Sequence, residues 1–66
     1  MRIVLNGVDE DLSESLTIAG LIANKEINPV NVIVEHNYTI VKNDAWQSVI
    51  LQENDNLEIL RLVGGG

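Results

Sequence analysis

The first twelve residues have the pattern of a β-hairpin: apolar residues at every second position, a turn signal, and a second short segment. Met1, Ile3 and Leu5 fall on one face at a period of two, which predicts a first strand with one buried face. The Asn-Gly pair at residues 6–7 is a strong signal for a tight two-residue turn. We therefore expect residues 8 to about 12 to return as the second, antiparallel strand of a hairpin.

After residue 17 the apolar positions change to the period of an amphipathic α-helix. Thr17 offers a hydroxyl for the N-cap, and the Asn-Pro pair at residues 28–29 is expected to end the helix, because proline excludes its predecessor from the α region. Gly20 costs about 0.5–1 kcal/mol relative to alanine inside a helix, so either close packing against the sheet requires it or the helix is marginal. The predicted buried face consists of Ile18, Leu21 and Ile22.

The middle of the chain is rich in β-branched residues and predicts two extended segments. Residues 30–35 are expected to form a buried strand that ends in a turn near residues 36–37, and residues 38–42 a short extended piece. Residues 43–46 predict a local turn or short helix that places Trp46 against the core. A single Trp in a small protein usually supplies packing area, so we interpret Trp46 as a core residue rather than a binding aromatic.

Two more strands are predicted near the end of the chain, at residues 49–51 and 57–62. The polar Glu-Asn-Asp-Asn sequence of residues 53–56 supplies the turn between them. The sequence has no internal repeat, and its 66 residues are enough for one domain only. Strands on both sides of a single helix predict an α+β fold.

The last predicted strand carries apolar residues on both of its faces. Leu57 and Ile59 are expected to face the core. Alternation then puts Glu58, Leu60 and Leu62 on the opposite face, beside the end of the chain. Two exposed leucines at this place indicate a docking patch for a partner protein. The other interpretation, which the sequence leaves open, is that another part of the small fold covers them.

The chain ends in three glycines, residues 64–66, directly after this apolar strand. Without a Cβ, glycine passes through narrow channels in which other residues would clash, so such an end can enter a partner's active site. Ordering the last four residues costs about 4–8 kcal/mol of backbone entropy, so the partner must also hold the folded body. We therefore predict a folded domain, residues 1–63, and a flexible tail whose reactive group is the α-carboxylate of Gly66. The alternative is a frayed chain end. The residues expected to contact the partner are Leu60, Leu62, Val63, Gly64 and Gly65.

The chain carries ten acidic and four basic residues, for a net charge of −6 at pH 7. Binding of nucleic acid requires a concentration of Lys and Arg that displaces counterions, so this composition disfavours DNA and RNA as partners. The acidic residues 9–14 are interpreted as a solvated turn, or as a surface that steers the chain toward a basic protein. No apolar run is long enough to span a membrane and residues 1–5 lack the features of a signal peptide, so we expect no membrane association. The absence of cysteine is compatible with the cytoplasm, where we expect the protein.

His36 is the only histidine, and no cysteine or carboxylate stands near it in the sequence at a ligand or catalytic spacing. We therefore assign it no function. The chain also has no Cys/His pattern for a structural metal, so its core must be aliphatic and efficiently packed. A chain of this length leaves no room for an enclosed active-site cleft with a lid.

The order and spacing of six short features carry a family resemblance over essentially the whole chain. They are the Ile-Val-Leu-Asn-Gly of residues 3–7, the helix entry at Thr17, Ile18 and Leu21, the Ile-Val pair at 40–41, Trp46, Asp55 before the last strand, and the Gly-Gly end at 65–66. Together they resemble the ThiS-type sulfur carriers of thiamine biosynthesis, in the ThiS/MoaD superfamily. The resemblance implies a β-grasp (ubiquitin-like) fold with one main helix packed across a mixed sheet. The third glycine, Gly64, is a departure, because many relatives carry a side chain there.

The resemblance also implies chemistry at Gly66. In such carriers a ThiF-like adenylating enzyme uses ATP and Mg²⁺ to join the terminal carboxylate to AMP. Sulfur mobilised from cysteine by a desulfurase then displaces AMP and leaves a thiocarboxylate, and a ThiG-like thiazole synthase receives the sulfur. On this interpretation the chain is a co-substrate rather than an enzyme, and it binds no cofactor or metal itself, because ATP and the metal belong to the partner.

Several alternatives remain open from the sequence. The same carrier chemistry can supply molybdopterin synthesis, transfer-RNA thiolation or amino-acid synthesis, although MoaD-type chains are generally longer and often carry a proline near the tail. A ubiquitin-like modifier, whose end is joined to target lysines, is suggested by the Arg-Leu pair at residues 61–62 before the glycines. A binding domain with a glycine linker is the third possibility.

Overall fold

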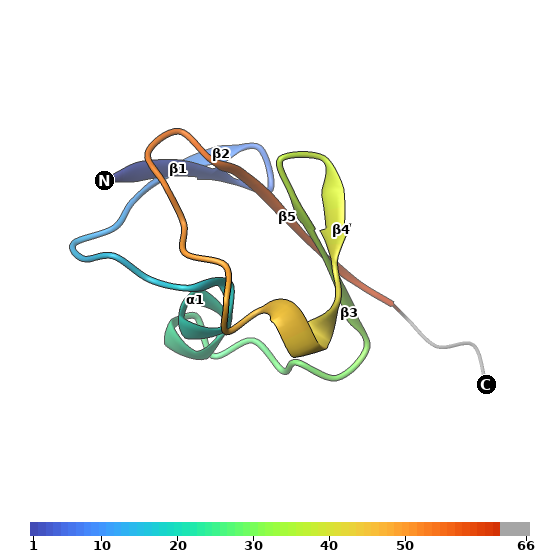
Figure 1. Cartoon of the computed structure of the whole chain (residues 1–66). Helices are drawn as coiled ribbons and strands as arrows, with labels where there is room; N and C mark the ends of the chain where they lie inside the picture. The colour runs from blue at the N-terminus through green and yellow to red at the C-terminus, as the bar shows by residue number, and fades with distance from the viewer. Residues whose placement is uncertain (63–66) are drawn as a thin grey trace.

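In the computed structural model, which describes residues 1–62, a five-stranded mixed sheet carries one α-helix across one face (Figure 1). The predictions for Val63, Gly64, Gly65 and Gly66 lie outside the described residues. The elements are β1 (Arg2–Leu5), β2 (Val8–Asp11), α1 (Ile18–Asn24), β3 (Val32–His36), β4 (Thr39–Val41), the 3-10 helix η1 (Asn43–Ala45) and β5 (Asn56–Arg61).

The first hairpin confirms the prediction from the alternating pattern. β1 and β2 pair antiparallel, with Leu5 opposite Val8 next to the turn. The two turn residues, Asn6 and Gly7, both have positive φ, of 51° and 81°. This is the conformation that a two-residue turn between twisted strands requires, and Asn-Gly is the pair that adopts it most readily.

The sheet order is β2-β1-β5-β3-β4, so the last strand lies in the middle (Figure 1). β5 runs parallel to β1 and antiparallel to β3, which makes the sheet mixed. Backbone hydrogen bonds from Val4 N to Asp55 O and from Asn6 N to Leu57 O, each 2.9 Å, join the parallel pair. The arrangement is the expected α+β architecture of the β-grasp fold.

The helix α1 begins as predicted. The Oγ1 of Thr17 accepts a hydrogen bond from Gly20 N at 3.0 Å, which satisfies one of the free donors of the first turn. A Cβ at Gly20 would lie 3.3 Å from that same Oγ1. The close contact of Gly20 is therefore with the N-cap residue and not with the sheet, which was one of the two expectations. The predicted apolar face is buried in a core that consists of Ile3, Ile18, Leu21, Ile22, Val34, Trp46, Leu51 and Leu57.

The helix ends earlier than the Asn-Pro pair predicts, at Asn24. Glu26 takes a left-handed conformation, with φ of 57°, and its N–H donates to Ala23 O at 3.0 Å. Ile27 N donates to Ile22 O, also at 3.0 Å. These two bonds form a Schellman motif, which usually carries glycine at the left-handed position. Because glutamate stands there instead, the sequence holds no clear signal for this end.

The second hairpin differs in detail from its prediction. β3 begins at Val32 rather than at residue 30, because Asn31 adopts a left-handed φ of 64°. The turn consists of Asn37 and Tyr38, both with positive φ, and leads into β4. Trp46 follows η1, is buried, and donates from Nε1 to Val41 O at 2.9 Å. Its interpretation as a core residue is confirmed.

Residues 49–51 do not form the predicted strand. They make one isolated antiparallel bridge, between Thr17 and Ile50. Ile18 N donates to Val49 O at 3.0 Å, and Leu51 N donates to Leu16 O at 2.9 Å. The segment therefore pairs with the chain that enters α1 rather than with the sheet, and its apolar sequence supplies Leu51 to the core.

Candidate functional site

The end of β5 presents apolar side chains to solvent beside the last described residue. Leu57 is fully buried and Ile59 is partly buried against the core, as predicted. Leu60 and Leu62 point the other way and are 47% and 52% exposed. The predicted alternation is thus confirmed, and no part of residues 1–62 buries the two leucines. Their role in binding a partner stays a prediction.

The pairing of β5 with β3, and of β3 with β4, brings further apolar residues to the same face of the sheet. Ile33 on β3 lies directly opposite Leu60, and Ile40 on β4 lies opposite Glu35, the next residue of β3 on that face. Ile40 is 63% exposed. We call the surface formed by Ile33, Ile40, Leu60 and Leu62 the outer patch. The sequence analysis missed Ile33 and Ile40, because alternation within a strand does not reveal which residues of another strand stand beside it.

A backbone hydrogen bond holds the chain where it leaves the sheet. Leu62 N donates to Asn31 O at 2.7 Å, in the loop that precedes β3. Together with the Val32–Arg61 pair, this bond fixes Leu62 against the start of β3. The outer patch thus ends at the last residue that the structure describes.

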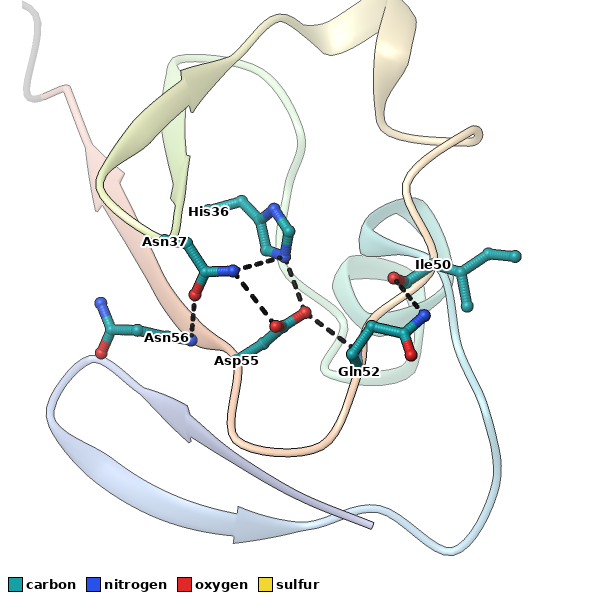
Figure 2. Close-up of polar contacts among 6 residues, drawn as sticks. All are labelled: His36, Asn37, Ile50, Gln52, Asp55 and Asn56. Atoms are coloured by element: carbon teal, nitrogen blue, oxygen red, sulfur yellow. Dashed lines mark hydrogen bonds and ion pairs between the residues drawn. The ribbon is translucent and has the colours of Figure 1, made fainter.

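A second cluster of polar groups lies at the opposite end of β5, around the buried carboxylate of Asp55 (Figure 2). Its Oδ2 accepts hydrogen bonds from His36 Nε2 at 2.7 Å and from Gln52 N at 2.8 Å, and its Oδ1 accepts one from Asn37 Nδ2 at 3.1 Å. Asn37 Oδ1 in turn accepts from Asn56 N at 2.8 Å. These contacts join the start of β5 to the turn between β3 and β4.

The environment of Asp55 lowers the pKa of its carboxyl group. Burial is the largest single influence and by itself raises this pKa, because it disfavours the charged form. The hydrogen bonds from His36, Gln52 N and Asn37 together outweigh it, since all three stabilise the ionised carboxylate. The Asp55 carboxyl group is therefore ionised in the folded chain. It fixes the orientation of His36 by accepting a hydrogen bond from Nε2.

His36 has the carboxylate neighbour that the sequence analysis did not find, because Asp55 is 19 residues away along the chain. The pair still lacks the other parts of a catalytic or metal site. Within residues 1–62 no three His, Cys, Asp or Glu side chains are grouped to hold a metal ion, and these residues enclose no pocket. We therefore interpret the Asp55 cluster as structural and the outer patch with the following chain end as the candidate functional site. No helix among the described residues is long and apolar enough to cross a membrane.

Comparison with known proteins gives concordant results. Residues 3–66 match the sequence pattern of the ThiS family. The chain is 36% identical over 63 residues to the sulfur carrier protein ThiS of Bacillus subtilis, covering 94% of this chain and 96% of that protein. It is 35% identical over 66 residues to the thiazole synthase of Magnetococcus marinus, but it spans only 20% of that protein's length. The crystal structure of the thiamine biosynthesis protein ThiS from Geobacter metallireducens superposes with a TM-score of 0.87 at 26% identity, with both chains covered completely.

Proposed function

This chain belongs to the ThiS family, and from that premise we propose that it is a sulfur carrier whose C-terminal carboxylate, at Gly66, becomes a thiocarboxylate. The sulfur is destined for the thiazole ring of thiamine. The observation that carries the proposal is that the family match extends to residue 66, so it includes the three glycines as well as the β-grasp body. A match of the body alone would fit any binding domain, whereas a match through residue 66 supports a role for the chain end.

The proposed reaction begins with a carboxylate that is a poor electrophile. A free α-carboxyl group has a pKa of about 3.3–3.7, so it is ionised at neutral pH. A ThiF-like enzyme joins it to the α-phosphorus of ATP, releases pyrophosphate and forms an acyl-adenylate. The terminal sulfur of a persulfide, made from cysteine by a desulfurase, attacks the acyl carbon, and AMP leaves with the electron pair of the broken C–O bond. A thiol then cleaves the S–S bond of the resulting acyl disulfide, which leaves a disulfide on the sulfur donor and releases the thiocarboxylate.

In this scheme ATP and Mg²⁺ are bound by the adenylating enzyme, while the present chain supplies recognition and the terminal carboxylate. We place the reaction in the cytoplasm, where ATP and the cysteine-derived sulfur are available. The chain contains no cysteine, so no internal thiol competes for the activated acyl group.

A thiazole synthase is the proposed recipient of the sulfur. All 66 residues align with a segment that makes up 20% of the thiazole synthases of Magnetococcus marinus and of Paramagnetospirillum magneticum. In those proteins a region similar to this chain is therefore covalently part of a longer chain named for the thiazole reaction. Such a linkage supports a ThiG-like enzyme as the partner, in preference to enzymes of molybdopterin or transfer-RNA synthesis.

The direct test is an intact mass measurement after incubation with the ThiF-like enzyme, ATP, Mg²⁺, cysteine, the desulfurase and a thiol reductant. We expect one oxygen of the chain to be replaced by sulfur, with fragment ions placing the change at Gly66. A parallel reaction without ATP controls for sulfur bound in other ways. If the mass remains that of the free carboxylate in the complete mixture, the carrier proposal is wrong.

The outer patch is the proposed binding surface for the adenylating enzyme. We expect Leu60→Asp to weaken binding to that enzyme about tenfold or more, because it puts a charge into a desolvated apolar contact. The melting temperature should change little, since Leu60 is about half exposed in the free chain. Isothermal titration calorimetry with the enzyme and circular dichroism of the carrier measure the two effects.

Val8→Asp is a matched control for this substitution. Val8 is 64% exposed and lies on β2, the edge strand that is separated from β5 by β1. It receives the same new charge far from the outer patch, so its binding should stay within about twofold of wild type. If the enzyme binds the Leu60→Asp chain as tightly as the wild-type chain, the outer patch is not its binding surface.

A further inference from the structure

Two acidic residues stand opposite each other on neighbouring strands in the middle of the sheet. Glu35 on β3 and Glu58 on β5 are direct antiparallel partners, and both are half-buried. Residues that stand opposite each other in this way have Cβ atoms about 4.5–5.5 Å apart, and like charges in such a pair destabilise a sheet. The fold therefore places a repulsive pair in a position where a neutral pair would be more stable.

No cation of the described chain neutralises this pair. The ion pairs within residues 1–62 join Arg2 to Asp9 and Asp11, Lys25 to Glu10, and His36 to Asp55. Lys42 follows Ile40 by two residues, so alternation places it on the same face, but it forms no ion pair with Glu35 or Glu58.

The carboxylates belong to the same surface as the outer patch. Glu58 precedes Leu60 by two residues on β5, and Glu35 lies between Glu58 and Ile40 in the register of the three strands. A protein that covers the outer patch therefore also removes water from the two carboxylates. Removing water from a carboxylate costs free energy unless the covering protein also brings a positive charge to it.

We propose that Glu35 and Glu58 together receive an arginine or lysine side chain of the adenylating enzyme, directly beside an apolar contact with the outer patch. This inference rests on the proposed function. The enzyme must hold Gly66, and an extended chain from Leu62 reaches only about 13 Å, so its surface around the active site lies close to this face. Charge complementarity selects the partner: an arginine can donate to both carboxylates at once, and it relieves their mutual repulsion.

The proposal predicts that stability and binding change in opposite directions. In the double variant Glu35→Gln with Glu58→Gln, removal of the repulsion should raise the melting temperature by roughly 1–5 °C. Affinity for the adenylating enzyme should fall about tenfold or more, and its dependence on salt concentration should become weaker. A residue pair with a purely structural role would not give a more stable carrier that binds less well.

The matched control is the double variant Glu14→Gln with Glu26→Gln. Both residues are exposed outside the sheet, and the variant has the same net charge as the test variant. A loss of affinity confined to the Glu35/Glu58 variant supports the proposal. Unchanged affinity of that variant, or an equal loss in the control, overturns it.

The mass assay keeps this inference separate from the proposed function. If the wild-type chain acquires sulfur while the Glu35/Glu58 variant binds as tightly as wild type, only the charged contact is wrong. If the wild-type chain neither binds the adenylating enzyme nor acquires sulfur, the proposed function fails and the contact fails with it.

Discussion

Replacing Asp55 by Asn is expected to lower the free energy of unfolding by about 2–4 kcal/mol at pH 7 and the melting temperature by more than about 10 °C. Asp55 is only 7% exposed and accepts three hydrogen bonds with its two oxygens. An asparagine amide in its place must turn its NH₂ group toward at least one of the three donors, which loses that hydrogen bond. It also carries no negative charge to strengthen the bonds that remain. The loss is a large part of the stability that a 66-residue domain can have.

The pH dependence of this loss follows from the lowered pKa of Asp55. The unfolded chain takes up the proton near the ordinary value of about 3.9, whereas the folded chain takes it up only at lower pH. The contribution of Asp55 to stability is therefore complete above about pH 4 and is lost as the pH falls through the folded pKa. Urea unfolding of wild type and variant between pH 7 and pH 2.5 should show their difference narrowing only at the acid end.

Asp44→Asn provides the comparison for the Asp55 variant. Asp44 is exposed in η1 and takes part in no ion pair within residues 1–62, so its replacement should change the melting temperature by no more than about 2 °C. If the Asp55 variant is as stable as the Asp44 variant at pH 7, the cluster around Asp55 does not hold β5 in place.

Deletion of Gly66 is expected to abolish sulfur loading while leaving the fold as stable as wild type. The new end would be Gly65, whose carboxylate stops about 3.3 Å short of the position at which we propose that the adenylating enzyme acts. A displacement of 1 Å is enough to cost about 100-fold in rate, so a shift of this size should remove activity within the limit of detection. The intact mass after the complete loading reaction measures the loss.

This deletion variant keeps the folded body that we propose the enzyme binds, so a loss of sulfur loading would be specific to the chain end. Its affinity should stay within about tenfold of wild type, because the outer patch and the Glu35–Glu58 pair remain. Substitution of Gly64 by Ala, which keeps the length of the chain, is the companion variant and should still acquire sulfur. Loading of the Gly66 deletion variant at the wild-type rate would show that the terminal position is not the reactive one.

The parts of the fold that the sequence predicted well depend on neighbours along the chain. The Asn6-Gly7 turn, the Thr17 cap and the alternation of Leu57 and Ile59 with Leu60 each follow from a local conformational preference or a period of two. The predicted ends of elements were wrong where a residue other than glycine adopts a left-handed backbone conformation. Glu26 ends α1 in the left-handed conformation that glycine normally adopts, so the sequence pointed instead to the later Asn-Pro pair.

The sequence by itself determined the alternating strands, the start of the helix, the acidic balance and the glycine end that makes Gly66 the candidate reactive group. Only the tertiary structure decided that Asp55 reaches His36, that Ile33 and Ile40 join the leucines of β5, and that Glu35 faces Glu58. The physical reason is that strand order and register are set by how the whole core packs. A shift of one residue in that register would turn every side chain of a strand to the other face.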